Sequence, residues 1–325
     1  MHIRTCLHIT LLLSLGCAPA LAQEQFPSRP ITLIVPFPAG GAFDWVGRIV
    51  AEGMKASLGQ PVVIENVSGA GGTIRVGRVA RSAPNGYTLG LGISATHVVN
   101  GAIYTLSYDL LKDFEPISLI ATGPSVIVSK NGVPAQDLPQ LIAWLKANPG
   151  KATFATNGAG SPPHIAGILL EKLTDTHLQF VPYRGAAPAM QDLLGGQVDL
   201  SILQATVVLP QARAGKLRAY AVTATRRIDS APDIPTVDEA GLQGLYISIW
   251  SALWAPRGTP RNVVGTLNAA LTVALTDPTV RRRLAESGQE IFPREQQTPA
   301  ALAALQKAEI EKWWPIIKAA NIKAE

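Results

Sequence analysis

Four glycine turns hold the residues of this sequence that could do chemistry. Each turn follows an apolar run of strand length and precedes a helical pattern, and the four lie at residues 36–44, 68–73, 157–161 and 182–185. A helix that begins at such a turn leaves backbone N–H groups unpaired at the positive end of its dipole. These groups can bind a small anion such as a carboxylate. One turn alone would be an ordinary strand-to-helix connection, so the prediction depends on their recurrence.

The side chains near these turns leave alternatives open. Asp44 precedes an apolar helical pattern, so we expect it to cap or brace that helix rather than to act as an acid. Phe37 and Phe43 either belong to the core or line a pocket. Arg184 either pairs with a solute carboxylate or is an exposed loop charge, and Arg75 has the same two interpretations.

Motifs for nucleotide, nucleophile and metal chemistry do not fit the sequence. The turns read G-A-G-G-T-I from residue 69 and G-A-G-S-P-P from residue 158, so both lack the last glycine of a dinucleotide fingerprint. Ser161 and His164 could belong to a triad, but residues three apart at a helix start more often cap the helix. His97, His164 and His177 lack ligand spacing. We therefore expect no catalytic residue, cofactor or metal.

The first 22 residues predict export. Arg4 precedes an apolar run at residues 7–15, and the small-x-small triplet at residues 20–22 offers a cleavage site before Gln23. The apolar run is too short to span a membrane. We therefore predict a signal peptide over residues 1–22.

Cysteine usage supports a periplasmic location. Cys6 and Cys17 lie in the predicted signal peptide, so the remaining 303 residues hold no cysteine and can form no internal disulfide. Cys17 could be a lipid attachment site, but Ser14 stands where such motifs usually carry leucine, and we do not expect lipidation.

The charge distribution argues against nucleic-acid binding. The formal net charge is +5, and the basic residues are scattered apart from one cluster at residues 281–283. Nucleic-acid binding would require a basic stripe with aromatic neighbours. A mildly basic surface would attract an anionic solute only weakly.

Strands alternate with helices, which predicts an α/β fold with a parallel sheet covered on both faces. Besides a strand end at residue 180, the expected strands are 31–35, 61–65, 87–93, 152–155, 197–203, 217–222 and 250–255. Besides a helix that opens at 162, the expected helices are 45–58, 74–81, 137–147, 187–194, 260–275, 278–286 and 299–320.

The length predicts two lobes joined by two chain crossings. The first crossing is expected near residues 117–130, where two strand-like runs are broken by Gly123-Pro124. The second is expected near residues 225–245, which are rich in Pro, Asp and Gly. Lobe I would hold residues 23–122 and 245–325, and lobe II residues 123–244. Ligands of such sheets bind beyond the carboxyl ends of the strands, which predicts a site between the lobes.

Eight segments occur in order along the chain: FPSRPITLIVPFPAGGAFD (26–44), SGAGGTI (68–74), APNGYTL (83–89), KANPGKATFATNGAGSPPH (146–164), PYRGAAPAMQDLLGGQVD (182–199), GKLRAYAVT (215–223), PDIPTVDEAG (232–241) and APRGTP (255–260). Together they resemble the substrate-binding proteins of tripartite tricarboxylate transporters, the Bug-type extracytoplasmic solute receptors. The resemblance implies a two-lobed, type II-like periplasmic binding protein with two crossings and a ligand cleft. Members of the family clamp small organic acids through backbone N–H groups, hydroxyls and bridging waters.

The resemblance also implies the site residues. In lobe I the contacts map onto Phe37, Ala39, Gly40, Gly41, Asp44, Ser94, Thr96 and His97. In lobe II they map onto Asn157, Gly158, Gly160, Ser161, His164, Tyr183, Arg184 and Gly185. Phe43 borders the same turn and completes the candidate set.

The chain departs from the family pattern at five positions: Phe43 replaces a small or hydroxylated residue, Ser68 a proline, Arg75 a glycine, Gly101 a proline and Gln204 an Asn or Asp. Phe43 and Arg75 border the presumed pocket, which suggests an aromatic or elongated carboxylate as ligand.

We therefore expect a monomeric periplasmic receptor that passes a small organic acid to the permease subunits of a tripartite transporter. The acid could be a di- or tricarboxylate, an amino acid or an aromatic carboxylate. Two alternatives are a sensor that feeds a signalling receptor and a hydrolase that uses Ser161 and His164.

Overall fold

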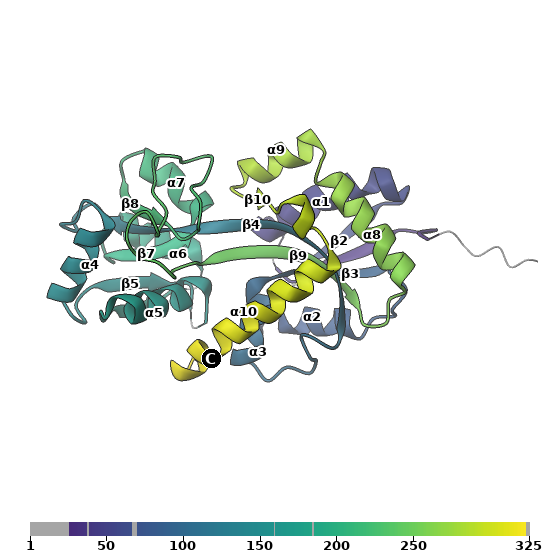
Figure 1. The fold of residues 1–325 in the computed structure, drawn as a ribbon, viewed down its shortest axis with the longest axis horizontal. Coiled ribbons are helices and arrows are strands. Elements are labelled where there is room, and N and C mark those ends of the chain that lie inside the picture. Colours follow the sequence, from purple (N-terminus) through teal and green to yellow (C-terminus); the bar gives the residue numbers. More distant parts are fainter. Residues whose placement is uncertain (1–25, 38, 67–69, 159, 184, 323–325) are drawn as a thin grey trace, which may run out of the picture.

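The computed structural model describes residues 26–322, apart from residues 38, 67–69, 159 and 184. The predicted signal peptide and Cys17 lie outside the described residues. Figure 1 shows two α/β bodies side by side, with β4 (Phe114–Lys130) and β9 (Ser248–Pro256) running through the middle of the molecule. In the described residues the sheet has ten strands: eight follow the order β2-β1-β3-β9-β4-β7-β5-β6, and β8 and β10 lie off this path and pair with β4.

The first half of the sheet is built on parallel strands. β1 (Ile31–Val35) pairs in parallel with β2 (Val62–Asn66) and with β3 (Thr88–Ile93). Antiparallel pairing then joins β3 to β9, β9 to β4, and β4 to β10 (Glu290–Ile291). The helical elements of this part are α1 (Ala42–Leu58), η1 (Ala70–Gly72), α2 (Thr73–Ala80), η2 (Ala95–Val99), α3 (Asn100–Ile103), α8 (Arg261–Ala274), α9 (Pro278–Glu286), η3 (Arg294–Gln296) and α10 (Pro299–Ala319).

The second half of the sheet starts from the end of β4. This end pairs antiparallel with β7 (Leu200–Gln204) and β8 (Leu217–Val222). β5 (Thr153–Thr156) then pairs in parallel with both β7 and β6 (Gln179–Pro182). The helices of this half are α4 (Leu138–Ala147), α5 (Pro162–Thr174), α6 (Ala186–Leu194) and α7 (Ala205–Arg213).

Helical periodicity explains how α1 joins the core. Val46, Ile49, Val50 and Met54 are buried at helical spacing and form one apolar stripe. The stripe shares an apolar cluster with residues of β1, β3 and α8. Gly53 permits a close approach to α8, because a Cβ there would lie 2.8 Å from Ala274 Cβ. This packing fixes the direction in which the N-terminus of α1 points.

The alternation of strands and helices confirms the predicted α/β class, but the prediction of a parallel sheet is wrong for its centre, where β4 and β9 pair antiparallel with each other and with their neighbours. β4 is one strand of 17 residues rather than two runs broken at Gly123-Pro124. Both residues pair with β9, so the backbone stays extended where the strand passes between the halves of the sheet. A helical segment from Ser94 to Ile103 was not expected, because its apolar residues continue those of β3 without a separate periodicity. Since β4 spans residues 122 and 123, the lobe boundary near them stays a prediction.

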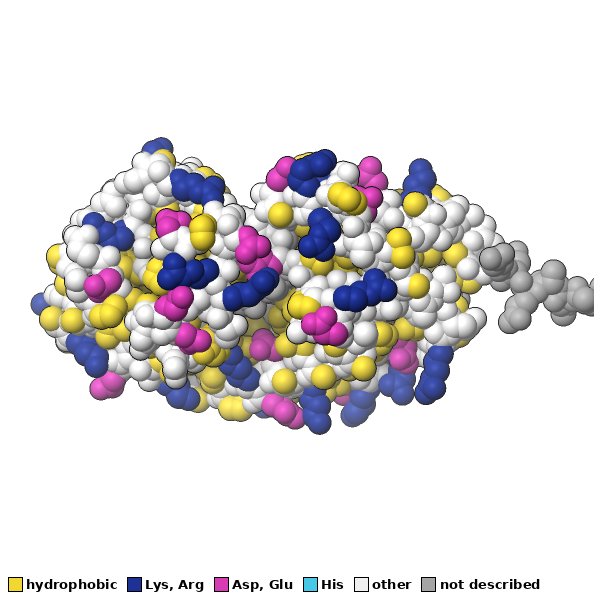
Figure 2. All heavy atoms as spheres, turned by 45° about the horizontal axis from the view of Figure 1, so that its top comes forward, with side chains coloured by type: hydrophobic (Ala, Val, Ile, Leu, Met, Phe, Trp, Pro, Cys, Tyr) yellow, Lys and Arg dark blue, Asp and Glu magenta, His cyan; other side chains and the backbone are white. Residues whose placement is uncertain are grey.

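The charge distribution on the surface and the length of the helices bear on nucleic acid and membrane as partners. Figure 2 shows the Lys and Arg side chains of the visible face dispersed among Asp and Glu, with no continuous basic stripe on that face. Among residues 26–322 as described, no single helix is long and apolar enough to cross a membrane. The bent pair α8 and α9, at 75° to one another, satisfies that test by length and composition alone.

Candidate functional site

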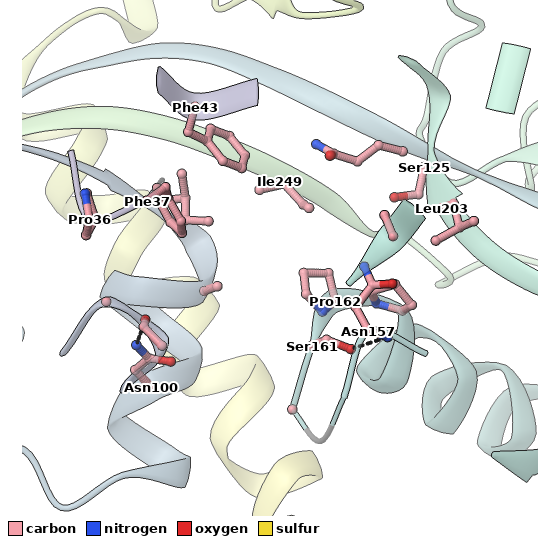
Figure 3. Close-up of a pocket in the computed structure, with 18 of the residues that line it drawn as sticks. Pro36, Phe37, Phe43, Asn100, Ser125, Asn157, Ser161, Pro162, Leu203 and Ile249 are labelled. Carbon is pink, nitrogen blue, oxygen red and sulfur yellow. Dashed lines mark hydrogen bonds between the residues drawn. The ribbon is translucent and has the colours of Figure 1, made fainter. Parts of the chain in front are cut away.

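A cavity of about 460 Å³ lies between the two halves of the sheet. The first half contributes Phe37 and Phe43 from the β1–α1 turn and Tyr104 from the end of α3. The second half contributes Asn157 and Ser161 from the β5–α5 turn. Figure 3 shows these two turns on opposite sides of the cavity. Strand ends and helix starts therefore build this site from both parts of the sheet.

Several helices begin at the cavity. Phe43 is the second residue of α1, Gly72 precedes α2, Ala186 is the first residue of α6, and Gln204 precedes α7. All four residues line the cavity. The N–H groups of a first helical turn have no partner inside the helix, and the helix dipole is positive there. The cavity is therefore surrounded by positive helix ends that favour an anion.

The α5 end differs from the others because Pro162 and Pro163 occupy its first two positions. Proline has no N–H, so these positions present apolar rings to the cavity. The preceding turn uses its own groups internally. The Asn157 N–H donates to Ser161 Oγ at 3.2 Å, and the Gly160 N–H donates to His164 Nδ1 at 3.0 Å. The start of α5 therefore contributes two proline rings and the Ser161 hydroxyl to the cavity lining, rather than free backbone N–H donors.

The described residues that line the cavity include no charged side chain. The polar side chains are those of Asn100, Tyr104, Ser125, Asn157, Ser161 and Gln204. Two of them hold buried atoms with no hydrogen-bond partner among the described residues, namely Asn157 Oδ1 and Gln204 Nε2. A buried polar atom without a partner costs free energy, so these amides favour a bound polar group or water.

One wall of the cavity is aromatic. The rings of Phe37 and Phe43 lie 5.3 Å apart between centroids, at 42° to each other. Both side chains are half-buried. Ile103 and Ile249 extend the apolar lining. The two phenylalanines therefore line the cavity and also pack against the core around β1 and α1.

Asp44 braces the first turn and does not line the cavity. It is the third residue of α1, and it accepts hydrogen bonds from the Gly40 N–H at 2.8 Å, Arg48 Nε at 2.9 Å and Asn66 Nδ2 at 2.9 Å. Burial by itself raises the pKa of Asp44, but the hydrogen bonds from Arg48, Gly40 and Asn66 outweigh it and lower the pKa. The ionised carboxylate thus holds the turn in shape.

His97 and Thr96 are buried and do not line the cavity. The His97 ring is 2 % exposed, and its Nδ1 lies 3.0 Å from Thr96 Oγ1. Burial lowers the pKa of His97 to about 3, so the ring is neutral at physiological pH. Thr96 Oγ1 also bonds to the backbone of Ile93. These two residues shape the end of β3.

His164 does not pair with Ser161. Its Nδ1 accepts from the Gly160 N–H, so the ring braces the turn, and burial lowers the pKa of His164. The Tyr183 hydroxyl donates to Asp192 Oδ2 at 2.7 Å. Burial, followed by the bond to Asp192, raises the pKa of Tyr183 to about 12. Ser161 and His164 therefore have structural partners, and the geometry assembles no nucleophile and base from them.

The cavity gathers part of the predicted set: Phe37, Phe43, Asn157, Gly160 and Ser161. The remaining described candidates do not line it: Ala39, Gly40, Gly41, Asp44, Ser94, Thr96, His97, Gly158, His164, Tyr183 and Gly185. Arg184 lies outside the described residues. A ligand contact by any candidate of either group stays a prediction.

Other lining residues were not predicted, among them Asn100, Tyr104, Ser125, Gln204 and Ile249. Gln204 ends β7 just before α7; the strand expected at residues 197–203 marks this end, but the helix that follows was not predicted. Ser125 and Ile249 lie within long strands, and nothing local marks them as cavity residues.

Comparisons with known proteins agree with this architecture. A sequence profile described as the tripartite tricarboxylate transporter family receptor matches residues 46–322. The structure of the periplasmic binding protein BugD is 38 % identical, with a TM-score of 0.77, and the match covers 92 % of this chain and 100 % of that chain.

Two further similar structures contain ligands. MatC from Rhodopseudomonas palustris, with bound malate, is 38 % identical with a TM-score of 0.77, over 90 % of this chain and 100 % of that chain. A second R. palustris protein, with adipate, is 32 % identical with a TM-score of 0.80, over 92 % of this chain and 100 % of that chain. The similarity thus extends over nearly the whole chain, and it confirms the two-lobed periplasmic binding protein fold.

Proposed function

The chain belongs to the tripartite tricarboxylate transporter family of receptors, and we propose that it captures a small organic carboxylate between two lobes and delivers it to the membrane subunits of such a transporter. The observation that carries this proposal is a cavity onto which α1, α2, α6 and α7 direct their N-termini, with no charged side chain in its described lining. Backbone N–H groups and hydroxyls are then the donors for the carboxylate.

The ligands of similar proteins support this ligand class. Malate and adipate are the molecules named with the two R. palustris structures, and both are small carboxylates. Closure of the lobes over such a ligand would exclude water and strengthen each N–H to carboxylate bond. Removal of one donor should cost about 1–3 kcal/mol, or roughly tenfold to a hundredfold in affinity.

The proposed place of action is the periplasm. BugD is described as a periplasmic binding protein, and receptors of this family bind solutes without transforming them. The predicted signal peptide at residues 1–22 would direct the chain to that compartment. We propose that it acts there as a monomer without a lipid anchor.

The first test identifies the ligand. Small molecules released from the purified receptor are identified by mass spectrometry and are then titrated in thermal-shift and calorimetric assays. A specific ligand stabilises the fold by RT ln(1 + [L]/Kd), which is about 2.7 kcal/mol at a hundredfold excess over Kd. Each acid is compared with its neutral amide. Equal binding of the acid and its amide, or the absence of any carboxylate that binds, would contradict the proposal.

A matched pair of variants tests the helix ends. Ala186→Pro removes the first N–H of α6 at a position that accepts proline. Arg261→Pro makes the same change at the start of α8, which does not line the cavity. We expect tenfold or greater loss of carboxylate affinity in the first variant and no change in the second. Cells that carry Ala186→Pro should also take up less labelled ligand than cells that carry the wild type, whereas Arg261→Pro should leave uptake unchanged.

A further inference from the structure

The two sides of the cavity differ in polarity. In Figure 3 Phe37 and Phe43 lie on the α1 side, whereas Ser125, Asn157 and Ser161 lie on the opposite side. The α1 side also carries Asn100, whose amide donates to the Gly71 carbonyl, and the hydroxyl of Tyr104. A ligand that spans the cavity therefore meets mainly hydroxyls and amides at one end and mainly aromatic carbon at the other.

The polar side holds the groups that lack partners. Asn157 Oδ1 and Gln204 Nε2 are buried without a hydrogen-bond partner among the described residues, and Gln204 precedes α7. The register of β4 and β7 places Ser125 directly opposite Gln204. A side-chain amide can turn to present its N–H₂ to an anion. This end can therefore hold one carboxylate through hydroxyl, amide and helix N-terminus together.

The aromatic side is unsuited to a second carboxylate. In a helix the side chains lean toward the N-terminus, so Phe43 at the second position of α1 leans over the end of its own helix. Together with Phe37 it presents ring carbon where an N–H donor would otherwise face the ligand. No described lining residue carries a positive charge that could pair with an anion there. The donors left on this side are the ends of α1 and α2 and the Tyr104 hydroxyl, and a second carboxylate held by them would still lie against ring carbon, where its lost hydration is not fully replaced.

The volume is sufficient for a ring. An apolar cavity of about 150 Å³ can hold benzene. The cavity of about 460 Å³ therefore has room for a ring, a carboxylate and several waters. Aromatic rings gain about 0.5–1.5 kcal/mol by packing at centroid distances of about 4.5–7 Å, beyond the burial of their area.

We infer that the preferred ligand is an aromatic monocarboxylate, with its carboxylate at the Ser125–Asn157–Gln204 end and its ring against Phe37 and Phe43. This inference rests on the proposed function, because it assigns a substrate class to the same cavity. On this inference, the aromatic wall formed by Phe37 and Phe43 distinguishes this receptor from one that binds dicarboxylates.

Calorimetry with defined probes tests the inference. Benzoate and phenylacetate are compared with succinate and malate, and cyclohexanecarboxylate is included to separate ring stacking from apolar burial. We expect both aromatic acids to bind at least tenfold more tightly than either dicarboxylate. Tighter binding of succinate or malate would overturn the inference and leave the proposed function intact. Failure of every carboxylate to bind would overturn both.

Substitutions in α1 and in the turn before it test whether the phenylalanine rings cause the preference for aromatic acids. Phe43→Ser should weaken phenylacetate about tenfold, as expected for roughly 50 Å² of lost apolar contact, and change succinate affinity less than twofold. Trp45→Ala, two residues along α1, removes a half-exposed ring that does not line the cavity and should change neither. Phe37→Leu gives a second, milder test should Phe43→Ser unfold. Unchanged phenylacetate affinity in a folded Phe43→Ser or Phe37→Leu variant would contradict the inference.

Discussion

His97 lies flat against Trp254, with ring centroids 3.8 Å apart and ring planes inclined by 13°. The edge of Phe114 contacts the same histidine at 5.3 Å between centroids. These aromatic neighbours exclude water from the ring, and this burial lowers the pKa of His97. The stacked pair therefore makes the stability of the fold sensitive to acid.

The first prediction concerns pH. The pKa of His97 is about 3 in the folded chain and about 6.5 in the unfolded chain, so below pH 6.5 the unfolded state binds more protons. The free energy of unfolding should fall as the pH drops from 6.5, by up to about 1.4 kcal/mol per pH unit for this group. Urea unfolding between pH 4 and 7 measures it.

The variant His97→Phe should flatten this pH dependence, because it keeps an aromatic ring and removes the titrating group. His177→Gln removes an exposed histidine and serves as the control. An equal slope in wild type and His97→Phe would show that other groups produce the acid sensitivity.

The second prediction concerns Asp44. Replacement by Asn removes the charge that accepts bonds from Gly40, Arg48 and Asn66, and should reduce the free energy of unfolding at pH 7 by about 1–3 kcal/mol. Because the folded pKa is lowered, this contribution is complete above about pH 3.8 and is lost as the pH falls through the lower folded value. Chemical denaturation at pH 7 and pH 3 checks both statements.

Arg48→Ala separates the contributions to this brace. The Arg48 side chain is 49 % exposed, so its loss should cost less than about 1 kcal/mol. If Arg48→Ala proved as damaging as Asp44→Asn, the ion pair rather than the buried hydrogen bonds would hold the turn.

The third prediction concerns the contact between the two sides of the cavity. Gly160 has φ +70°, and a Cβ there would lie too close to Ile103 Cδ1 of α3. Gly160→Ala should therefore weaken ligand binding at least tenfold, because it strains the turn and separates it from α3. Calorimetry on a double-mutant cycle with Ile103→Ala measures the coupling, and Ile103→Ala should restore part of the loss. Strictly additive effects would contradict the contact.

The fourth prediction concerns Ser161. Ser161→Ala leaves the Asn157 N–H without its acceptor and should weaken carboxylate binding about tenfold, at a stability cost of about 1 kcal/mol. Ser287→Ala removes a hydroxyl that donates to the Leu284 carbonyl away from the cavity, and binding should not change. Calorimetry on both variants gives the comparison. Wild-type affinity in Ser161→Ala would contradict a role for this hydroxyl in carboxylate binding.

Local patterns along the sequence predicted most strands and helices in the right order, although they missed η2, α3 and α7. The strand expected at residues 217–222 is β8, and the helix expected at 187–194 begins one residue earlier as α6. Apolar periodicity, proline at helix starts and glycine at turns act within a few residues, so they can be recognised without a structure. Such local patterns also predicted the glycine turn at residues 157–161, and Asn157 and Ser161 of this turn line the cavity.

Only the tertiary structure decided which polar residues face the cavity and which serve the core. His97 follows a strand end just as a ligand contact would, yet Trp254, far along the chain, covers it. Ser125 and Ile249 enter the lining because β4 and β9 are central strands that join the two halves of the sheet. The exposure of a side chain depends on what packs over it, and those neighbours are distant in sequence. The sequence by itself therefore determined most of the elements, the glycine turns and the family resemblance, whereas long-range packing decided the shape and polarity of the cavity.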